Sequence, residues 1–115
     1  MTDDPDQLVF SYGALQLAEL QRAILGRIFS AEDDMLPGFT LDYADMADPR
    51  FGELTGTSQH PVLRRTGDPR DKIIGKVYRF TEDELDAADQ FEVLMFRREQ
   101  VTLASGRTAW VYLTG

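Results

Sequence analysis

The residue with the clearest potential for chemistry in this sequence is Glu92, because the surrounding pattern turns it toward the apolar side of a helix. Thr81 to Glu84 has the order Thr-x-x-Glu of a capping box, which predicts that a helix begins there. Leu85 and Ala88 then mark an apolar stripe. Glu92 follows Leu85 by seven residues and Ala88 by four, so helical spacing places all three on one face.

A carboxylate on an apolar face needs a chemical or structural reason. Removal from water without a partner is costly for the charged form and raises the pKa, which suits a general acid or base near neutral pH. The sequence leaves a second interpretation open, in which the helix ends at Gln90 or Phe91. Glu92 would then lie in solvent or pair with Arg97 or Arg98.

Two groups of residues, one in each half of the chain, accompany Glu92. The apolar run Leu8-Val9-Phe10 leads into Ser11-Tyr12-Gly13-Ala14-Leu15. The second group comprises Gly75-Lys76-Val77-Tyr78, Leu85, Asp89-Gln90-Phe91-Glu92, Phe96-Arg97-Arg98 and Ala109-Trp110-Val111-Tyr112. In type, order and separation these motifs resemble the γ-glutamylcyclotransferase-like (AIG2-like) family, whose opening strand leads into a Tyr-Gly-Thr/Ser-Leu loop. The resemblance runs from about Leu8 to Leu113.

The resemblance implies a fold and a domain organisation. The expected fold class is α+β: a small mixed, largely antiparallel β-barrel with peripheral helices and a polar cavity at one end. Residues 1–115 are expected to form a single domain in which 1–6 are a flexible N-terminus. The residue pattern without the resemblance predicts only an α+β domain.

The resemblance also implies an activity, the cyclisation of a γ-glutamyl amine or γ-glutamyl amino acid to 5-oxoproline with release of the free amine. Glu92 matches the family's catalytic glutamate and would act as general acid/base. The loop Tyr12, Gly13, Ala14 and Leu15 matches the segment that receives the glutamyl end of the substrate. Arg98 matches the arginine after the aromatic, and it either contacts substrate or neutralises Glu92 or Asp89. No metal and no cofactor are implied.

Several residues keep a structural interpretation beside the functional one. Tyr12 fits equally well as a core aromatic with a satisfied hydroxyl, and Trp110 and Tyr112 share a strand face on which they would fill the barrel. Ala14 replaces the family's usual Thr or Ser, and Phe96 stands where a tyrosine is common. These two departures support an alternative function, a non-catalytic module that binds a small metabolite or serves as a subunit of a complex.

Composition limits the partners. A chain of 115 residues that is 43% hydrophobic can build one core. The net charge of −8 argues against nucleic acid and anionic membranes, so the expected partner is a small γ-glutamyl or other carboxylate-bearing molecule. With no cysteine and one histidine, thiolate and His-rich metal sites are excluded. The acidic start lacks a signal-peptide pattern, which predicts a cytoplasmic location, and no feature specifies an oligomeric state.

Hydrophobic periodicity and turn residues predict the elements that position these residues. A helix is expected from about Leu17 to Leu25, with Leu17, Leu20 and Ile24 on its buried side and Gly26 at its end. The acidic cluster Glu32-Asp33-Asp34 is interpreted as a solvated turn, and Asp45 to Gly56 as a loop. Strands are expected at Leu8–Ser11, Phe39–Tyr43, Ile73–Phe80, Phe96–Leu103 and Thr108–Leu113, with a short edge segment at His60–Leu63.

Overall fold

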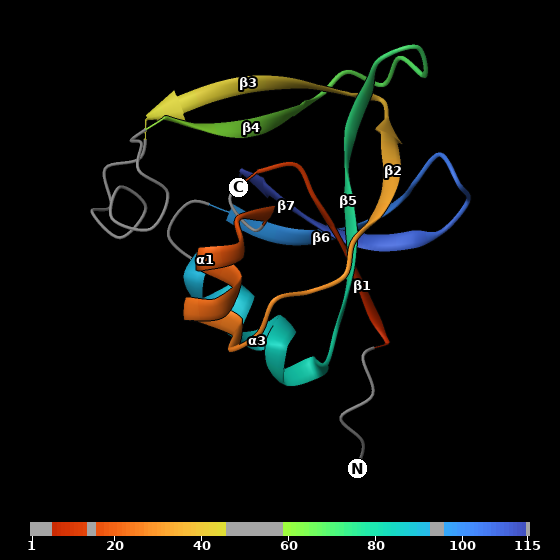
Figure 1. Cartoon of the computed structure of the whole chain (residues 1–115). Helices are drawn as coiled ribbons and strands as arrows, with labels where there is room; N and C mark the ends of the chain where they lie inside the picture. The colour runs from red at the N-terminus through yellow and green to blue at the C-terminus, as the bar shows by residue number, and fades with distance from the viewer. Residues whose placement is uncertain (1–5, 14–15, 46–58, 93–95, 115) are drawn as a thin grey trace.

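The computed structural model describes residues 6–13, 16–45, 59–92 and 96–114. Figure 1 shows the β3 and β4 pair lying across one end of the larger sheet, with the helices grouped on one side. The elements in chain order are β1 (Gln7–Ser11), α1 (Ala18–Leu20), η2 (Gln21–Leu25), β2 (Glu32–Pro37), β3 (Phe39–Asp45), β4 (Gln59–Arg65), β5 (Lys72–Phe80), α3 (Glu82–Glu92), β6 (Phe96–Thr102) and β7 (Thr108–Thr114).

Five strands form a mixed sheet in the order β2-β5-β1-β7-β6, in which only β1 and β7 run parallel. The α+β class and the largely antiparallel pairing are therefore as expected. Among the described residues no ladder closes this sheet into a barrel, and β3 and β4 pair separately. The two sheet edges do meet at one point, where the amide of Ala104 in the β6–β7 turn donates to the Met35 carbonyl of β2 (2.8 Å).

The sheet is buried on both faces because its central strands alternate between two hydrophobic clusters. In β1, Val9 packs against the helices while Phe10 points to the opposite face. β7 follows the same period, with Tyr112 on the helix side and Val111 on the other. The second cluster lies between the sheet and the β3–β4 hairpin and includes Phe39 from that hairpin.

A glycine is required at position 75, where β5 lies close beside the end of its neighbour β1. A Cβ atom at this position would lie 2.5 Å from both the Phe10 ring and the Ser11 carbonyl oxygen. Real Cβ atoms do not approach other atoms so closely, so any larger residue would push the two strands apart. This close approach gives a structural reason for the glycine that opens the second group of family-like residues.

The first helical segment begins and ends near the expected residues, and Leu20 and Ile24 pack toward the core as expected, whereas Leu17 does not. Gly26 ends it with φ +82° as expected, while Leu17 is 42% exposed. Leu20 and Leu25 are the buried leucines, five residues apart. The reason is that Gln21–Leu25 is a π-helix, whose wider turn aligns residues at a spacing of five.

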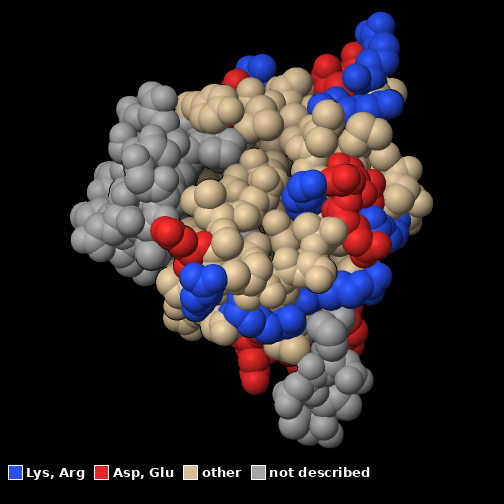
Figure 2. Space-filling view, in the orientation of Figure 1, with Lys and Arg blue, Asp and Glu red and all other residues tan. Residues whose placement is uncertain are grey.

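The interpretation of Glu32-Asp33-Asp34 as a solvated turn is wrong, because these residues begin β2 and pair with β5. Glu32 and Asp33 are exposed, whereas Asp34 is buried. Figure 2 shows acidic side chains gathered over β2 with basic ones beside them. The strand is acidic because cationic partners come from other strands, such as Lys76, which forms an ion pair with Asp33.

The capping box predicted at Thr81 is confirmed, and it starts the helix that carries Glu92. The Thr81 amide donates to Glu84 Oε1 (2.8 Å), and the Glu84 amide donates to Thr81 Oγ1 (3.1 Å). α3 then continues through Glu92, so the interpretation that ends it at Gln90 or Phe91 is wrong. A salt bridge from Arg27 to Glu84 (2.7 Å) attaches the start of α3 to the segment after η2.

The remaining strand predictions are confirmed with small changes in their bounds. The edge segment at His60 is longer than expected and forms β4, which pairs along its whole length with β3. Asp45, the first residue of the expected loop, instead ends β3, and the rest of that segment lies outside the described residues. None of the helices that the structure describes is long and apolar enough to span a membrane.

Candidate functional site

Strand register brings the predicted site residues to one end of the large sheet. Val9 of β1 lies opposite Trp110 of the parallel strand β7, so the chain leaving β1 emerges at the carboxyl end of β7. β6 starts at the same end, because Arg97 pairs with Leu113. In Figure 1 this end of β7, marked C, lies between the β3–β4 hairpin and α1. The predicted substrate loop and the start of β6 therefore share one end of the molecule.

The substrate loop is described as far as Gly13, and Ala14 and Leu15 lie outside the described residues. The Tyr12 hydroxyl donates a hydrogen bond to the backbone carbonyl of Tyr112. This contact satisfies the hydroxyl and joins the loop to β7, as the structural interpretation of Tyr12 predicted. The carbonyl of Gly13 accepts a bond from the Gln16 amide (3.0 Å).

Glu92 is the last residue of α3. The residues that define its predicted helical face are buried as expected: Leu85 and Ala88 both belong to the cluster between the helices and the sheet. The side chain of Glu92 itself lies outside what the structure describes, so its role as acid or base stays a prediction.

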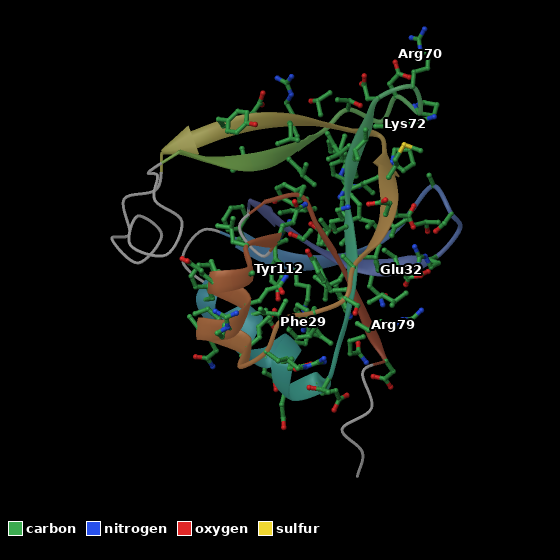
Figure 3. All side chains as sticks on the ribbon, in the orientation of Figure 1. Phe29, Glu32, Arg70, Lys72, Arg79 and Tyr112 are labelled. Carbon is green, nitrogen blue, oxygen red and sulfur yellow. The ribbon has the colours of Figure 1, made fainter. Side chains whose placement is uncertain are left out.

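One turn before Glu92, Asp89 joins three elements through its carboxylate. The Tyr112 hydroxyl of β7 donates to Asp89 Oδ1 (2.7 Å), and Arg98 of β6 forms a salt bridge with Asp89 Oδ2 (3.2 Å). Figure 3 labels Tyr112 between the sheet and the helices. Because Tyr112 also accepts the bond from Tyr12 through its carbonyl, a single residue of β7 contacts both the substrate loop and the helix of Glu92.

The Asp89 side chain faces a cavity of about 500 Å³ whose wall includes Arg98 and Trp110. The Arg98 guanidinium lies over the Trp110 ring at 4.2 Å from its centroid, a cation–π contact that holds the cation at the wall. Of the two carboxylates predicted as partners for Arg98, the structure shows the pair with Asp89. Phe96 also lines this cavity, so one of the two departures from the family pattern presents an apolar ring to it.

Sequence reasoning did not assign Asp89 and Tyr112 to the site. The two residues are 23 positions apart, and only the packing of α3 on the sheet brings the hydroxyl to the carboxylate. A partial signal was present, because Asp89 belongs to the same short motif as Glu92 and Tyr112 shares a strand face with Trp110. Tyr112 does fill the core as predicted, being buried against the helices, and its hydroxyl has this additional polar contact.

A metal centre has no support in the part of the chain that the structure describes. No group of three or more His, Cys, Asp or Glu residues there could hold a metal ion.

Comparison with known proteins places these observations in a family. A family model described as "Gamma-glutamyl cyclotransferase, AIG2-like" matches residues 9–115. No significant match was found among curated protein sequences.

Solved structures show the same fold. The chain superposes on a solution structure from Arabidopsis thaliana with a TM-score of 0.70 and 22% identity, covering 99% of this chain and 73% of that one. A structure described as a gamma-glutamyl cyclotransferase superposes with a TM-score of 0.71 and 20% identity, covering 95% of this chain and 66% of that one. An uncharacterised protein from Homo sapiens superposes with a TM-score of 0.70 and 20% identity, covering 97% of this chain and 68% of that one. The chain thus spans 66–73% of the length of these three proteins.

Proposed function

The chain belongs to the AIG2-like gamma-glutamyl cyclotransferase family, and we propose that it cyclises a γ-glutamyl amine or γ-glutamyl amino acid to 5-oxoproline with release of the free amine. The observation that carries this proposal is the position of Glu92. It ends the helix that is tied through Asp89 and Tyr112 to the loop beginning at Tyr12. The predicted proton-transfer group and the predicted substrate loop are thereby held by the same strand.

In the proposed reaction the α-amino nitrogen of the glutamyl group attacks its own γ-carbonyl carbon. A new C–N bond closes the five-membered lactam, and the bond from that carbon to the departing nitrogen breaks. Glu92 takes a proton from the attacking amine and gives one to the leaving amine, so the net proton count is unchanged. Because nucleophile and electrophile belong to one molecule, holding the substrate folded supplies much of the acceleration.

We place the glutamyl end of the substrate at the loop from Tyr12 to Leu15. Backbone amides in a loop that follows a strand can bind a carboxylate or a developing oxyanion, and the small Gly13 lets the main chain come close to a ligand. Arg98 supports this arrangement because its salt bridge with Asp89 attaches α3 to β6, the strand that pairs with β7.

The test is an assay for 5-oxoproline with a panel of γ-glutamyl amines and γ-glutamyl amino acids. Glu92→Gln keeps the size of the side chain but cannot take up a proton, so turnover is expected to fall by about 10²-fold or more. The matched control is Glu82→Gln, the same change at an exposed position in the first turn of the same helix. A Glu92→Gln enzyme within a few-fold of the wild type would remove Glu92 from the mechanism.

Phe96 favours the second candidate, a binding module without turnover, because it lines the cavity with a ring that has no hydroxyl. Under that function a γ-glutamyl compound would bind to the purified protein and no 5-oxoproline would form with any member of the panel.

A further inference from the structure

A second groove, of about 450 Å³, lies between the β3–β4 hairpin and the first residues of β6. Its floor is apolar and includes Phe39 and Leu113, whereas its walls hold three arginines, Arg64, Arg65 and Arg97, against two acidic residues. The chain as a whole carries a net charge of −8, whereas three cations outnumber two acids in the wall of this groove. Such a groove attracts anions in spite of the overall charge.

The arginines of this groove are only loosely paired. Arg65 and Arg97 share one carboxylate, Glu99, at 3.6 and 3.5 Å, and Arg64 is 3.7 Å from Asp42. A direct charge-assisted hydrogen bond between a guanidinium and a carboxylate measures about 2.7–2.9 Å. Each guanidinium has about five N–H donors, and a long ion pair uses little of that capacity. The groove can therefore offer donors to an anionic ligand.

Arg97 connects this groove to the candidate site. Its side chain also lines the cavity that contains Asp89, so the two hollows meet at this residue. An anion held by Arg97 therefore lies at the boundary between the groove and the cavity that contains Asp89.

We propose that Arg64, Arg65 and Arg97 form an electropositive rim that binds a carboxylate on the released amine, which makes γ-glutamyl compounds with an acidic leaving amine the preferred substrates. The substrate part of this inference rests on the proposed function, whereas the carboxylate site does not. The fork of a guanidinium matches a carboxylate in shape and charge, and the apolar floor suits a short carbon chain between the carboxylate and the scissile bond.

A binding experiment tests the rim without any turnover. N-acetyl-β-alanine carries the carboxylate of such an amine, and its neutral amide is the matched probe. In NMR titrations of the full chain, N-acetyl-β-alanine should shift the backbone amide resonances of Arg64, Arg65 and Arg97. The neutral probe should leave these resonances unchanged. Arg97→Gln should weaken binding of the carboxylate by about tenfold, the effect of losing one charged hydrogen bond.

Arg79→Gln is the matched control. Arg79 is as exposed as Arg65 (56% and 60%) and has a similar ion pair, with Glu32 at 3.5 Å, but it does not line the groove. Its loss should leave binding unchanged. Equal affinity of wild type and Arg97→Gln for the carboxylate probe would overturn the proposal, as would shifts confined to other parts of the chain. Arg65→Gln gives an independent second measurement.

An activity experiment then tests substrate preference. The γ-glutamyl derivatives of β-alanine, propylamine and 1,3-diaminopropane release amines of similar length that differ in charge. The expected order of kcat/KM is β-alanine, then propylamine, then diaminopropane. Arg65→Gln, at a residue that lines the groove and not the cavity of Asp89, should reduce the first value by about tenfold while changing the second little. Equal values for the three substrates would contradict the preference. If none is cyclised, the proposed function fails, and the binding experiment still decides whether the carboxylate site exists.

Discussion

Two aspartates at opposite ends of the β6–β7 hairpin are held by the same kinds of group. Asp34 of β2 accepts bonds from a serine hydroxyl, Ser105 (2.6 Å), and from the guanidinium of Arg107 (2.9 Å) at the hairpin's turn. Asp89 of α3 accepts a bond from a tyrosine hydroxyl and pairs with Arg98 at the hairpin's open end. Each aspartate therefore links a separate element to the hairpin.

The two aspartates differ in access. Only 4% of the Asp34 side chain is exposed, and the amides of Met35 and Ser105 also donate to it, so its oxygens are fully occupied by the protein. Asp89 is 35% exposed and lines a cavity. The same kinds of hydrogen bond and ion pair thus serve two purposes. The buried Asp34 fastens two sheet edges together, whereas the partly exposed Asp89 keeps polar groups available beside the predicted catalytic helix.

The largest effect on stability is expected from Asp34→Ala. The change removes the buried carboxylate that accepts bonds from Ser105, Arg107 and two backbone amides, which should lower the free energy of unfolding by about 1.5–3 kcal/mol, the range for hydrogen bonds to a charged group. Urea denaturation measures this loss. Asp33→Ala, one residue earlier and exposed, is the control and should cost much less. Equal losses in the two variants would show that Asp34 is not the fastening described above.

A smaller effect, but one that separates stability from function, is expected from Tyr112→Phe. Loss of the hydroxyl that donates to Asp89 should cost about 1 kcal/mol of stability and should also lower the kcat/KM for 5-oxoproline formation, because the polar wall beside α3 loses a fixed donor.

Tyr78→Phe is the matched control for that change. Tyr78 is equally buried on the same face of the sheet, and its hydroxyl bonds to Gln21 instead of Asp89. Its loss should cost a similar amount of stability without changing the kcat/KM. If both variants keep wild-type kinetics, the Asp89 network is structural in the same sense as the Asp34 cluster.

The smallest effect concerns pH. Burial raises the pKa of Asp34, but hydrogen bonds from Ser105, Met35 and Arg107 outweigh it, so the pKa lies below the ordinary value of 3.8. A depressed pKa means that the stabilising contribution is complete above pH 3.8 and is lost as the pH falls through the folded-state pKa.

The stability of the wild type should therefore decline more steeply below pH 3.8 than that of Asp34→Asn, which cannot titrate there. Urea denaturation at about pH 3 and about pH 6 measures the two slopes. An equal loss of stability on acidification in the wild type and in Asp34→Asn would contradict the lowered pKa of Asp34.

Local signals in the sequence predicted much of this fold. Capping by Thr81 and Glu84, and the helix end at Gly26 with its positive φ, depend on residues within a few positions of one another, and both were found where the sequence indicated. Binary patterning likewise predicted most strands. It failed at β2, because three consecutive acids indicate solvent exposure when their partners are not known.

The sequence by itself determined the family, the α+β class, and Glu92 as the candidate acid or base on α3. Only the tertiary structure decided the partners of the charged and polar groups. Asp34 meets Arg107 across 73 positions and Tyr12 meets Tyr112 across 100, contacts that depend on strand order rather than on any local pattern. The physical reason is that hydrogen bonds and ion pairs act over a few ångströms, whereas the residues that make them are brought together by burial of the hydrophobic faces on which the sheet, hairpin and helices pack.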